Sequence, residues 1–269
     1  LNSSFSEILY KVTSHPSMLI YLDNIWSSGE NSPETRDQRK NGKQAGLNDN
    51  LGRELLELHT VSPSAKYKEK DVRNSANVLA GWGTELEKPL NWMRDVANTT
   101  NHWDVYKQYW AEPGVKNVMG KVINQGKGGL RELTDFLAMH NHTITHLSTK
   151  LAQHFVSDNP SKSDITYIEN AWRKGNGNLD QIHTAVIEKA ILSKEPKFQW
   201  PMTWLFQTIR LSNATFFMGW DEVFDYDDKV MNHYEIYEEL GQSFWHSRQP
   251  DGYSSDKNEW LSGEMFERR

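Results

Sequence analysis

Apolar residues recur at helical spacing along most of the chain. The first stripe consists of Phe5, Ile8, Leu9 and Val12, and residues three or four positions apart lie on one face of an α-helix. Similar stripes, separated by proline, glycine or asparagine, continue over 16–25, 50–58, 71–81, 130–137, 144–155, 165–172, 179–192, 201–211 and 229–240. The periodicity predicts a mainly α protein, built as an irregular multi-helix bundle.

The pattern changes between residues 104 and 123. VYKQYW (105–110) and VKNVMGKVI (115–123) are rich in β-branched and aromatic residues, and they flank the turn-like Glu112-Pro113-Gly114. Short runs of this composition around a turn are typical of paired strands. We therefore predict one small β-hairpin near residues 104–123.

Residues 27–47 contain almost no apolar side chains and show no periodicity. Such a segment cannot bury enough surface to order itself, so we predict a flexible polar loop. No internal repeat divides the rest, and we expect a single mainly helical domain over residues 1–269. Because the sequence opens on Leu1 and not on methionine, we expect it to be a fragment of a longer chain.

The composition and charge of the chain argue against several classes of protein. No apolar run approaches the roughly 20 residues that cross a bilayer, so we expect no membrane span. The net charge is −6, and the 30 basic residues form no stripe that could follow phosphates, which argues against nucleic-acid binding. The absence of cysteine excludes disulfides, thiol catalysis and thiolate metal sites.

The segment NDNLGRELLELHT (48–60) carries the strongest candidate chemistry. On a helix, Asn50, Glu54 and Glu57 share one face with Arg53 beside them, while leucines occupy the other face. Arg53 stands four residues before Glu57, a spacing that allows an ion pair. The face is either solvated or a buried carboxylate pair suited to acid–base work or cation binding, and the neighbouring His59 favours some burial.

Two further groups have weaker signals. His142 and His146 are spaced to bind one metal from one helical face, but no acidic third ligand is nearby, so we assign no metal site and expect surface or capping histidines. Four tryptophans could form a wall that stacks on sugars or could simply pack in the core: Trp82, Trp92, Trp103 and Trp110. The sequence leaves both interpretations open.

Six segments, read in order, resemble the bacterial family called domain of unknown function 1800. They are HPSMLIYLDN, GLNDNLGRELLELHTV, YKEKDVRNSANVLAGW, KNVMG, LAMHNHTITHLSTKLAQHFVSDNP and LGQSFWHSRQPDGY, and they span nearly the whole chain. Positions that match the family pattern include Arg53, Glu54, Glu57, His59, Thr60, His140, Lys150 and Phe155. The chain departs from the pattern at Ala111-Glu112, where the family usually has His-Asp, and a preceding portion with a motif close to F-W-H-N-H-F is missing here.

The resemblance implies a mostly helical, exported protein with no established reaction, often encoded beside a second exported family, domain of unknown function 1501. We accordingly expect a periplasmic or secreted location and a companion protein of that second family. We expect any signal for export to lie upstream of the given residues, and the resemblance gives no cofactor.

Two functions follow as hypotheses. The first is a hydrolase-like enzyme acting on an envelope or extracellular polymer. Its expected catalytic residues are Glu54, Glu57, Arg53 and His59, with Arg53 clamping an anionic group, and its expected substrate-binding residues are Asn50, His140, Lys150 and Trp82. The second is a non-catalytic module that binds a glycan or a protein, or serves in assembly.

Overall fold

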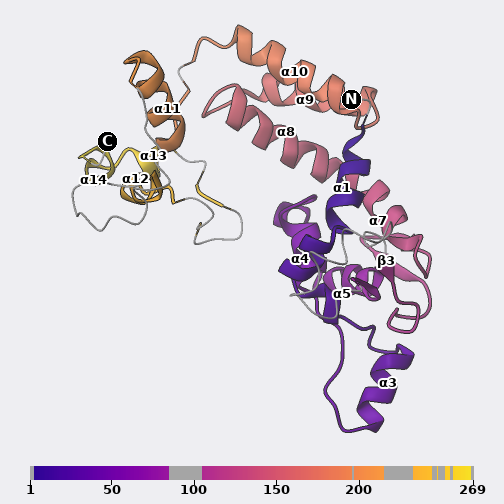
Figure 1. Ribbon diagram of the computed structural model, residues 1–269. Helices are drawn as coiled ribbons and strands as arrows, with labels where there is room; N and C mark the ends of the chain where they lie inside the picture. Colours follow the sequence, from indigo (N-terminus) through magenta and orange to yellow (C-terminus); the bar gives the residue numbers. More distant parts are fainter. Residues whose placement is uncertain are drawn as a thin grey trace, which may run out of the picture. The chain divides into compact units, whose positions relative to one another are not determined.

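The computed structural model describes residues 3–84, 105–195, 197–214, 233–243, 247, 252–254 and 257–267. Their contacts group the chain into two compact units, one of Leu1–Lys150 with Lys162–Val186 and the other of Leu151–Ser161 with Ile187–Arg269. The expectation of a single domain stays a prediction. The mainly α class is confirmed (Figure 1).

The helices are α1 Phe5–Thr13, α2 Pro16–Tyr21, α3 Pro33–Lys40, α4 Asn50–Glu57, α5 Glu69–Leu79, α7 Gly129–Ala138, α8 Asn141–Phe155, α9 Lys162–Lys174, α10 Leu179–Leu192, α11 Pro201–Leu211, α12 His233–Glu239, α13 Lys257–Trp260 and α14 Gly263–Glu267. Two 3₁₀ turns, η1 Asn24–Trp26 and η2 Pro63–Ala65, and the strands β1 Trp82–Gly83, β2 Val105–Tyr106, β3 Lys116–Val118 and β4 Lys121–Ile123 complete the described elements. None of these helices has the length and apolar character needed to cross a membrane.

The core of the first unit forms where α4 packs on α5, and α5 in turn contacts β3 and α7 (Figure 1). Leu51, Leu55 and Leu56 of α4 are fully buried. Each leucine removed from water contributes about 2 kcal/mol to folding. The apolar face of α4 therefore fixes how the helix is rotated, which decides where its polar residues point.

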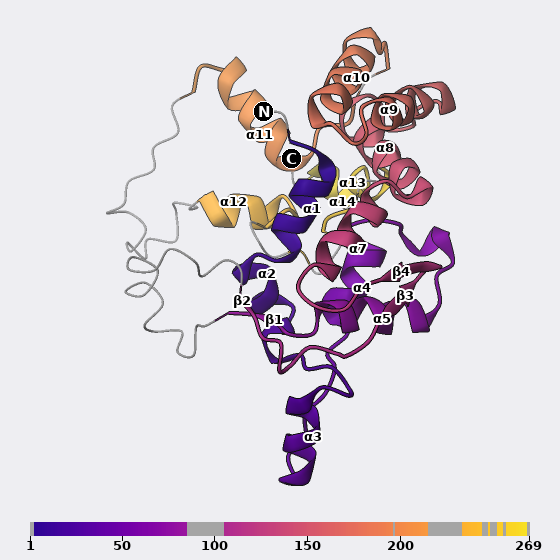
Figure 2. The same ribbon diagram turned by 90° about the vertical axis from the view of Figure 1, so that its right-hand side faces the viewer.

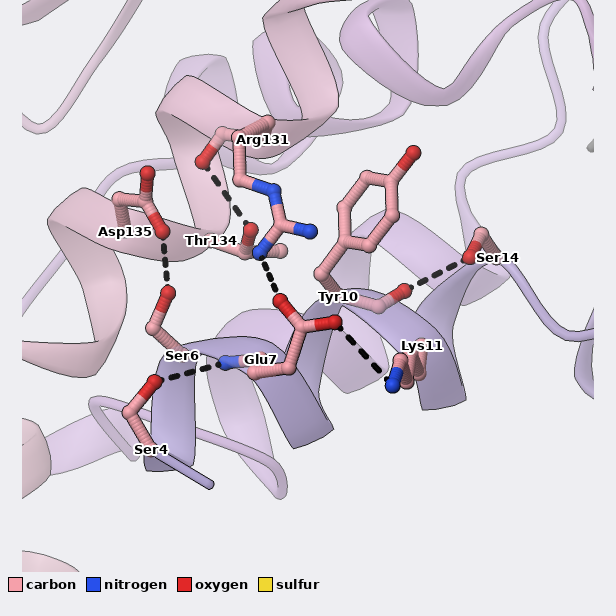
Figure 3. A network of polar contacts seen from close by, with 9 residues as sticks. All are labelled: Ser4, Ser6, Glu7, Tyr10, Lys11, Ser14, Arg131, Thr134 and Asp135. Carbon is pink, nitrogen blue, oxygen red and sulfur yellow. Dashed lines mark hydrogen bonds and ion pairs between the residues drawn. The ribbon is translucent and has the colours of Figure 1, made fainter. Parts of the chain in front are cut away.

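A polar network joins α1 to α7 (Figure 3). The Arg131 guanidinium donates to Glu7 Oε2 at 2.8 Å and lies 3.8 Å from the centre of the Tyr10 ring. The Ser6 hydroxyl donates to the Asp135 carboxylate. These contacts hold α1 against the core although the partners lie far apart in the sequence: Glu7 and Arg131 are 124 residues apart.

The predicted hairpin is confirmed, but it is smaller than the pattern indicated. Lys116–Val118 pairs with Lys121–Ile123 in antiparallel register, and the turn lies at Met119 and Gly120, both with positive φ. The Glu112-Pro113-Gly114 turn precedes this hairpin. Val105–Tyr106 pairs instead with Trp82–Gly83.

Residues 27–47, predicted as a polar loop, contain the two-turn helix α3 at the edge of the first unit (Figure 2). Ser32 caps it by accepting from Thr35 N at 3.2 Å, and Pro33 occupies the first turn. Ser28 and Thr35 are buried and share a hydrogen bond of 2.7 Å. Local capping and buried hydroxyls order this segment without an apolar face, which is why periodicity missed it.

The second unit has a smaller core of aromatic rings. The Trp260 ring lies 6.0 Å from that of Trp200 and 5.9 Å from that of Tyr253, between ring centres. Asp158 accepts from Phe198 N at 2.9 Å and is paired with Lys197. The helix predicted over 229–240 is described as α12, and its positions 229–232 lie outside the described residues.

Candidate functional site

The start of α4 is fixed by a buried serine. Ser27 Oγ donates to Asn48 O at 3.3 Å and accepts from Asn48 N at 3.1 Å. Asn48 Oδ1 then accepts from Asn50 N at 2.9 Å, which satisfies one of the free amides of the first turn. The polar face of α4 thus begins at a defined point of the fold, and the side chain of Asn50 is exposed there.

Arg53 pairs with two carboxylates, neither of which is the one expected. Its Nη2 lies 3.0 Å from Asp49 Oδ2 and 2.7 Å from Glu69 Oε1, and Nη1 donates to Glu69 Oε2 at 3.3 Å. The hydrogen bond that Arg53 donates to Glu69 is the main cause that raises the pKa of Arg53. A guanidinium already held by two carboxylates is poorly placed to clamp an anionic group.

Glu54 and Glu57 are half-buried, neither deep in the core nor in free solvent. Tyr67 is also half-buried. Burial raises the pKa of its phenol most, the negative charges of Glu57, Glu54 and Glu69 raise it further, and the positive charge of Arg53 lowers it. A phenol and two carboxylates whose charges influence one another on a half-buried face are groups that acid–base chemistry can use. We name Glu54, Glu57 and Tyr67 the α4 acid–base cluster.

Sequence reasoning missed Tyr67 because it lies outside any helix. After α4 the chain turns through η2, and Lys66 with φ of 53° sends residue 67 back toward the polar face. For the ion pair of Arg53, by contrast, the sequence does hold a signal. Asp49 lies four residues before Arg53, a spacing that pairs the two side chains on one helical face and competes with the pairing of Arg53 with Glu57.

His59 follows the end of α4, where its N–H donates to Glu54 O at 3.0 Å. Burial lowers the pKa of the imidazole. Its Nδ1 is buried and has no hydrogen-bond partner among the described residues. The imidazole is therefore neutral near pH 7, and its Nδ1 can still donate or accept a hydrogen bond beside the α4 acid–base cluster.

The remaining predicted site residues lie elsewhere. His140 Nδ1 accepts from His142 N at 3.3 Å at the start of α8, and its ring stacks on that of His142, so this side chain caps the helix. Its expected substrate-binding role stays a prediction. Lys150 is exposed on α8. Trp82 is 1% exposed and its ring packs on Tyr10 and Tyr106. This burial argues against a substrate-binding role for Trp82.

The other candidate groups are settled only in part. Trp92 and Trp103 lie outside the described residues, and Lys107 Nζ lies 5.0 Å from the centre of the Trp110 ring. Within the described part of the chain, no three His, Asp or Glu side chains gather closely enough to hold a metal ion.

Comparison with known proteins bears on lineage only. Neither the curated proteins nor the solved structures gave a match. Residues 2–269 match the family described as Protein of unknown function (DUF1800), in agreement with the resemblance of the six segments, and the chain belongs to that family.

Proposed function

We propose that the chain is a hydrolase-like enzyme that acts on an envelope or extracellular polymer through the α4 acid–base cluster. One observation carries the proposal: Glu54, Glu57 and Tyr67 are all half-buried, and the charges of both glutamates raise the pKa of the Tyr67 phenol. A group with a perturbed pKa beside carboxylates on a partly shielded surface is a feature of many active sites.

The chemistry follows from the protonation states. A carboxylate of Glu57 or Glu54 takes a proton from the attacking water. Tyr67, whose raised pKa keeps it protonated at neutral pH, donates a hydrogen bond to the oxygen that gains negative charge. General acid–base assistance of this kind contributes about 10²–10⁴ in rate.

Arg53 acts as a positioning residue in this proposal, because it ties α4 to the start of α5 through Glu69. This tie also restrains Tyr67 of the cluster, which stands two residues before Glu69. Export of the enzyme and a companion from the family called domain of unknown function 1501 belong to the same proposal, and they rest on the family resemblance alone.

The test compares four variants on a panel of dye-labelled polysaccharides, dye-labelled peptides and nitrophenyl esters. We expect turnover of at least one substrate, a loss of about 10²-fold or more in kcat for Glu57→Gln or Glu54→Gln, and a smaller loss for Tyr67→Phe. Glu132→Gln is the matched control, since among the described residues the side-chain carboxylate of Glu132 accepts hydrogen bonds from Asn124 alone. Thermal midpoints should stay within a few degrees throughout.

The alternative, a non-catalytic binding or assembly module, is favoured by the Arg53 ion pairs, which resemble a purely structural network. Under this alternative no substrate of the panel is hydrolysed. A labelled polysaccharide or peptide would then bind saturably, with the same affinity in wild type, Glu54→Gln and Glu57→Gln. That result would remove the enzymatic proposal.

A further inference from the structure

The chain contains two Asn–Gly dipeptides, Asn41–Gly42 and Asn176–Gly177. Both close a helix. At the end of α3, Gly42 N donates to Arg39 O at 3.1 Å and Lys43 N donates to Gln38 O at 2.9 Å. This pair of bonds defines a Schellman motif, which satisfies the last carbonyls of the helix.

The end of α9 has the same motif, because Gly177 N donates to Trp172 O at 2.9 Å and Asn176 N donates to Arg173 O at 3.2 Å. There the dipeptide is locked from outside as well. Gly177 is buried, and its carbonyl accepts from Phe5 N at 2.8 Å. Leu179 N donates to Ser3 O at 3.1 Å. Opening this end requires the start of α1 to detach.

The end of α3 has no such lock. Asn41 and Gly42 are exposed, and a Cβ placed on Gly42 would meet nothing within 4 Å. Residues 43–49 form neither helix nor strand, and α3 itself has 8 residues. A short exposed helix end opens locally at low free-energy cost, whereas a buried end opens only with the surrounding structure.

We propose that Asn41 is a spontaneous modification site at which the side-chain amide is converted to aspartate and isoaspartate. The Gly42 nitrogen attacks Asn41 Cγ, the Cγ–Nδ2 bond breaks, and the amide leaves as ammonia with the proton from the Gly42 N–H. Water then opens the resulting succinimide at either carbonyl. Opening at the side-chain carbonyl gives aspartate, and opening at the main-chain carbonyl gives isoaspartate.

Glycine after asparagine favours this ring closure because it has no Cβ to block the approach and rotates freely. Asn41 has ψ of 10°, so its backbone must leave the helical conformation before Gly42 N can reach Cγ. The local opening of α3 therefore controls the rate. The same requirement protects Asn176, whose following amide is held at 2.9 Å inside the first unit.

The product changes the end of α3. A new carboxylate stands at the negative end of the helix dipole and one turn from Asp37, which is unfavourable. Isoaspartate also adds a methylene to the main chain between residues 41 and 42. The bonds from Gly42 and Lys43 to the last turn then lose their register, and α3 frays from its C-terminal end.

The experiment incubates the full chain at about pH 8 and about 37 °C and follows both dipeptides by peptide mapping with mass spectrometry, where conversion adds about 1 Da. We expect Asn41 to convert at least about tenfold faster than Asn176. Labelling with an isoaspartyl methyltransferase should locate the isoaspartate at position 41. Asn41→Gln should remove the label, and Asn176→Gln should leave it unchanged.

Two synthetic peptides that carry each dipeptide with its flanking residues separate sequence from structure. They should react at similar rates when free. The proposal is overturned if Asn176 converts as fast as Asn41 in the folded protein, or if Asn41 stays intact while its free peptide converts. It is equally overturned if the two peptides alone reproduce the difference.

Discussion

Ser62 has a backbone conformation that residues other than glycine rarely adopt. Its φ is 61° and its ψ is 164°, and the strain there amounts to about 1–3 kcal/mol. The hydroxyl offsets part of it through a 2.7 Å bond with Ser64 Oγ. We expect Ser62→Gly to be more stable than Ser62→Ala by about 1 kcal/mol, because both lose the hydroxyl and only glycine relieves the strain.

Urea denaturation of the two Ser62 variants measures this difference. Alanine normally stabilises a chain relative to glycine, so the expected order is the reverse of the usual one. Equal stability, or a more stable alanine variant, would mean that the turn after α4 relaxes when the hydroxyl is lost.

Arg53 and Arg131 form a second comparison at the residue scale, since their side chains are 39% and 38% exposed. Exposed ion pairs contribute little, so Arg53→Ala should lower the free energy of unfolding by less than about 1 kcal/mol. Arg131→Ala should cost about 1 kcal/mol more, because Arg131 also covers the Tyr10 ring (Figure 3).

Thermal and urea unfolding of both arginine variants gives the measurement. A large loss of stability in Arg53→Ala would make the ion pairs with Asp49 and Glu69 a structural element of the fold. It would also weaken the proposal that Arg53 mainly positions the α4 acid–base cluster.

At the element scale, Gly52 sets how closely α4 approaches α5. A Cβ at Gly52 would lie 2.6 Å from Ala76 N, which is backbone and cannot move aside alone. Gly52→Ala should therefore destabilise the protein by about 2–3 kcal/mol. Gly128→Ala is the matched control: nothing lies within 4 Å of its Cβ, so its stability should change by less than about 1 kcal/mol.

Denaturation midpoints of the two glycine variants distinguish packing from backbone entropy. If Gly52→Ala were as mild as Gly128→Ala, α4 could shift on α5 without cost. The position of Glu54 and Glu57 relative to Tyr67 would then not be fixed by the core.

Helices with an apolar stripe could be predicted from the sequence, because burial of the stripe is what forms them, as in α4 and α7. Elements ordered by capping or by distant partners could not. In the hairpin turn Met119 has a φ of 50°. The turn contains neither Asn–Gly nor Asp–Gly, the dipeptides from which such a conformation is usually predicted. Asp71 accepts from Met119 N at 2.7 Å. Because the two residues are 48 positions apart, no pattern in the local sequence predicts this contact.

The candidate site divides in the same way. The pattern predicts Arg53, Glu54, Glu57 and His59 on one helix; the structure has the first three on α4 and His59 two residues beyond its end. It could not supply Tyr67 and Glu69, because the path from α4 to α5 depends on the conformations of Ser62 and Lys66.

At the scale of the whole molecule, three histidines of the first unit respond together to acid. Burial lowers the pKa of His59, His140 and His146 below the ordinary value of 6.5. Between 6.5 and these lowered values, the unfolded chain binds protons that the folded chain does not. The free energy of unfolding must therefore fall as the pH falls through this window, and it is highest above it.

Carboxylates act at lower pH and in the same direction. The hydrogen bond from Arg131 lowers the pKa of Glu7, and bonds from Asn124 lower the pKa of Glu132. Their stabilisation is present above the ordinary glutamate value and is lost as the pH falls through the lowered one. A loss of stability already under way near pH 6 is therefore assigned to the histidines.

Hydrogen exchange of peptides from α4 and α8, followed between about pH 7.5 and about pH 5.5 and corrected for the intrinsic exchange rate, measures this window. We expect protection to weaken toward acid, and His59→Gln to reduce the slope because glutamine does not titrate. His183→Gln, at an exposed histidine of α10, should leave the slope unchanged. A flat profile in wild type, or the same slope in His59→Gln, would show that neutral buried histidines do not limit the acid stability of the first unit.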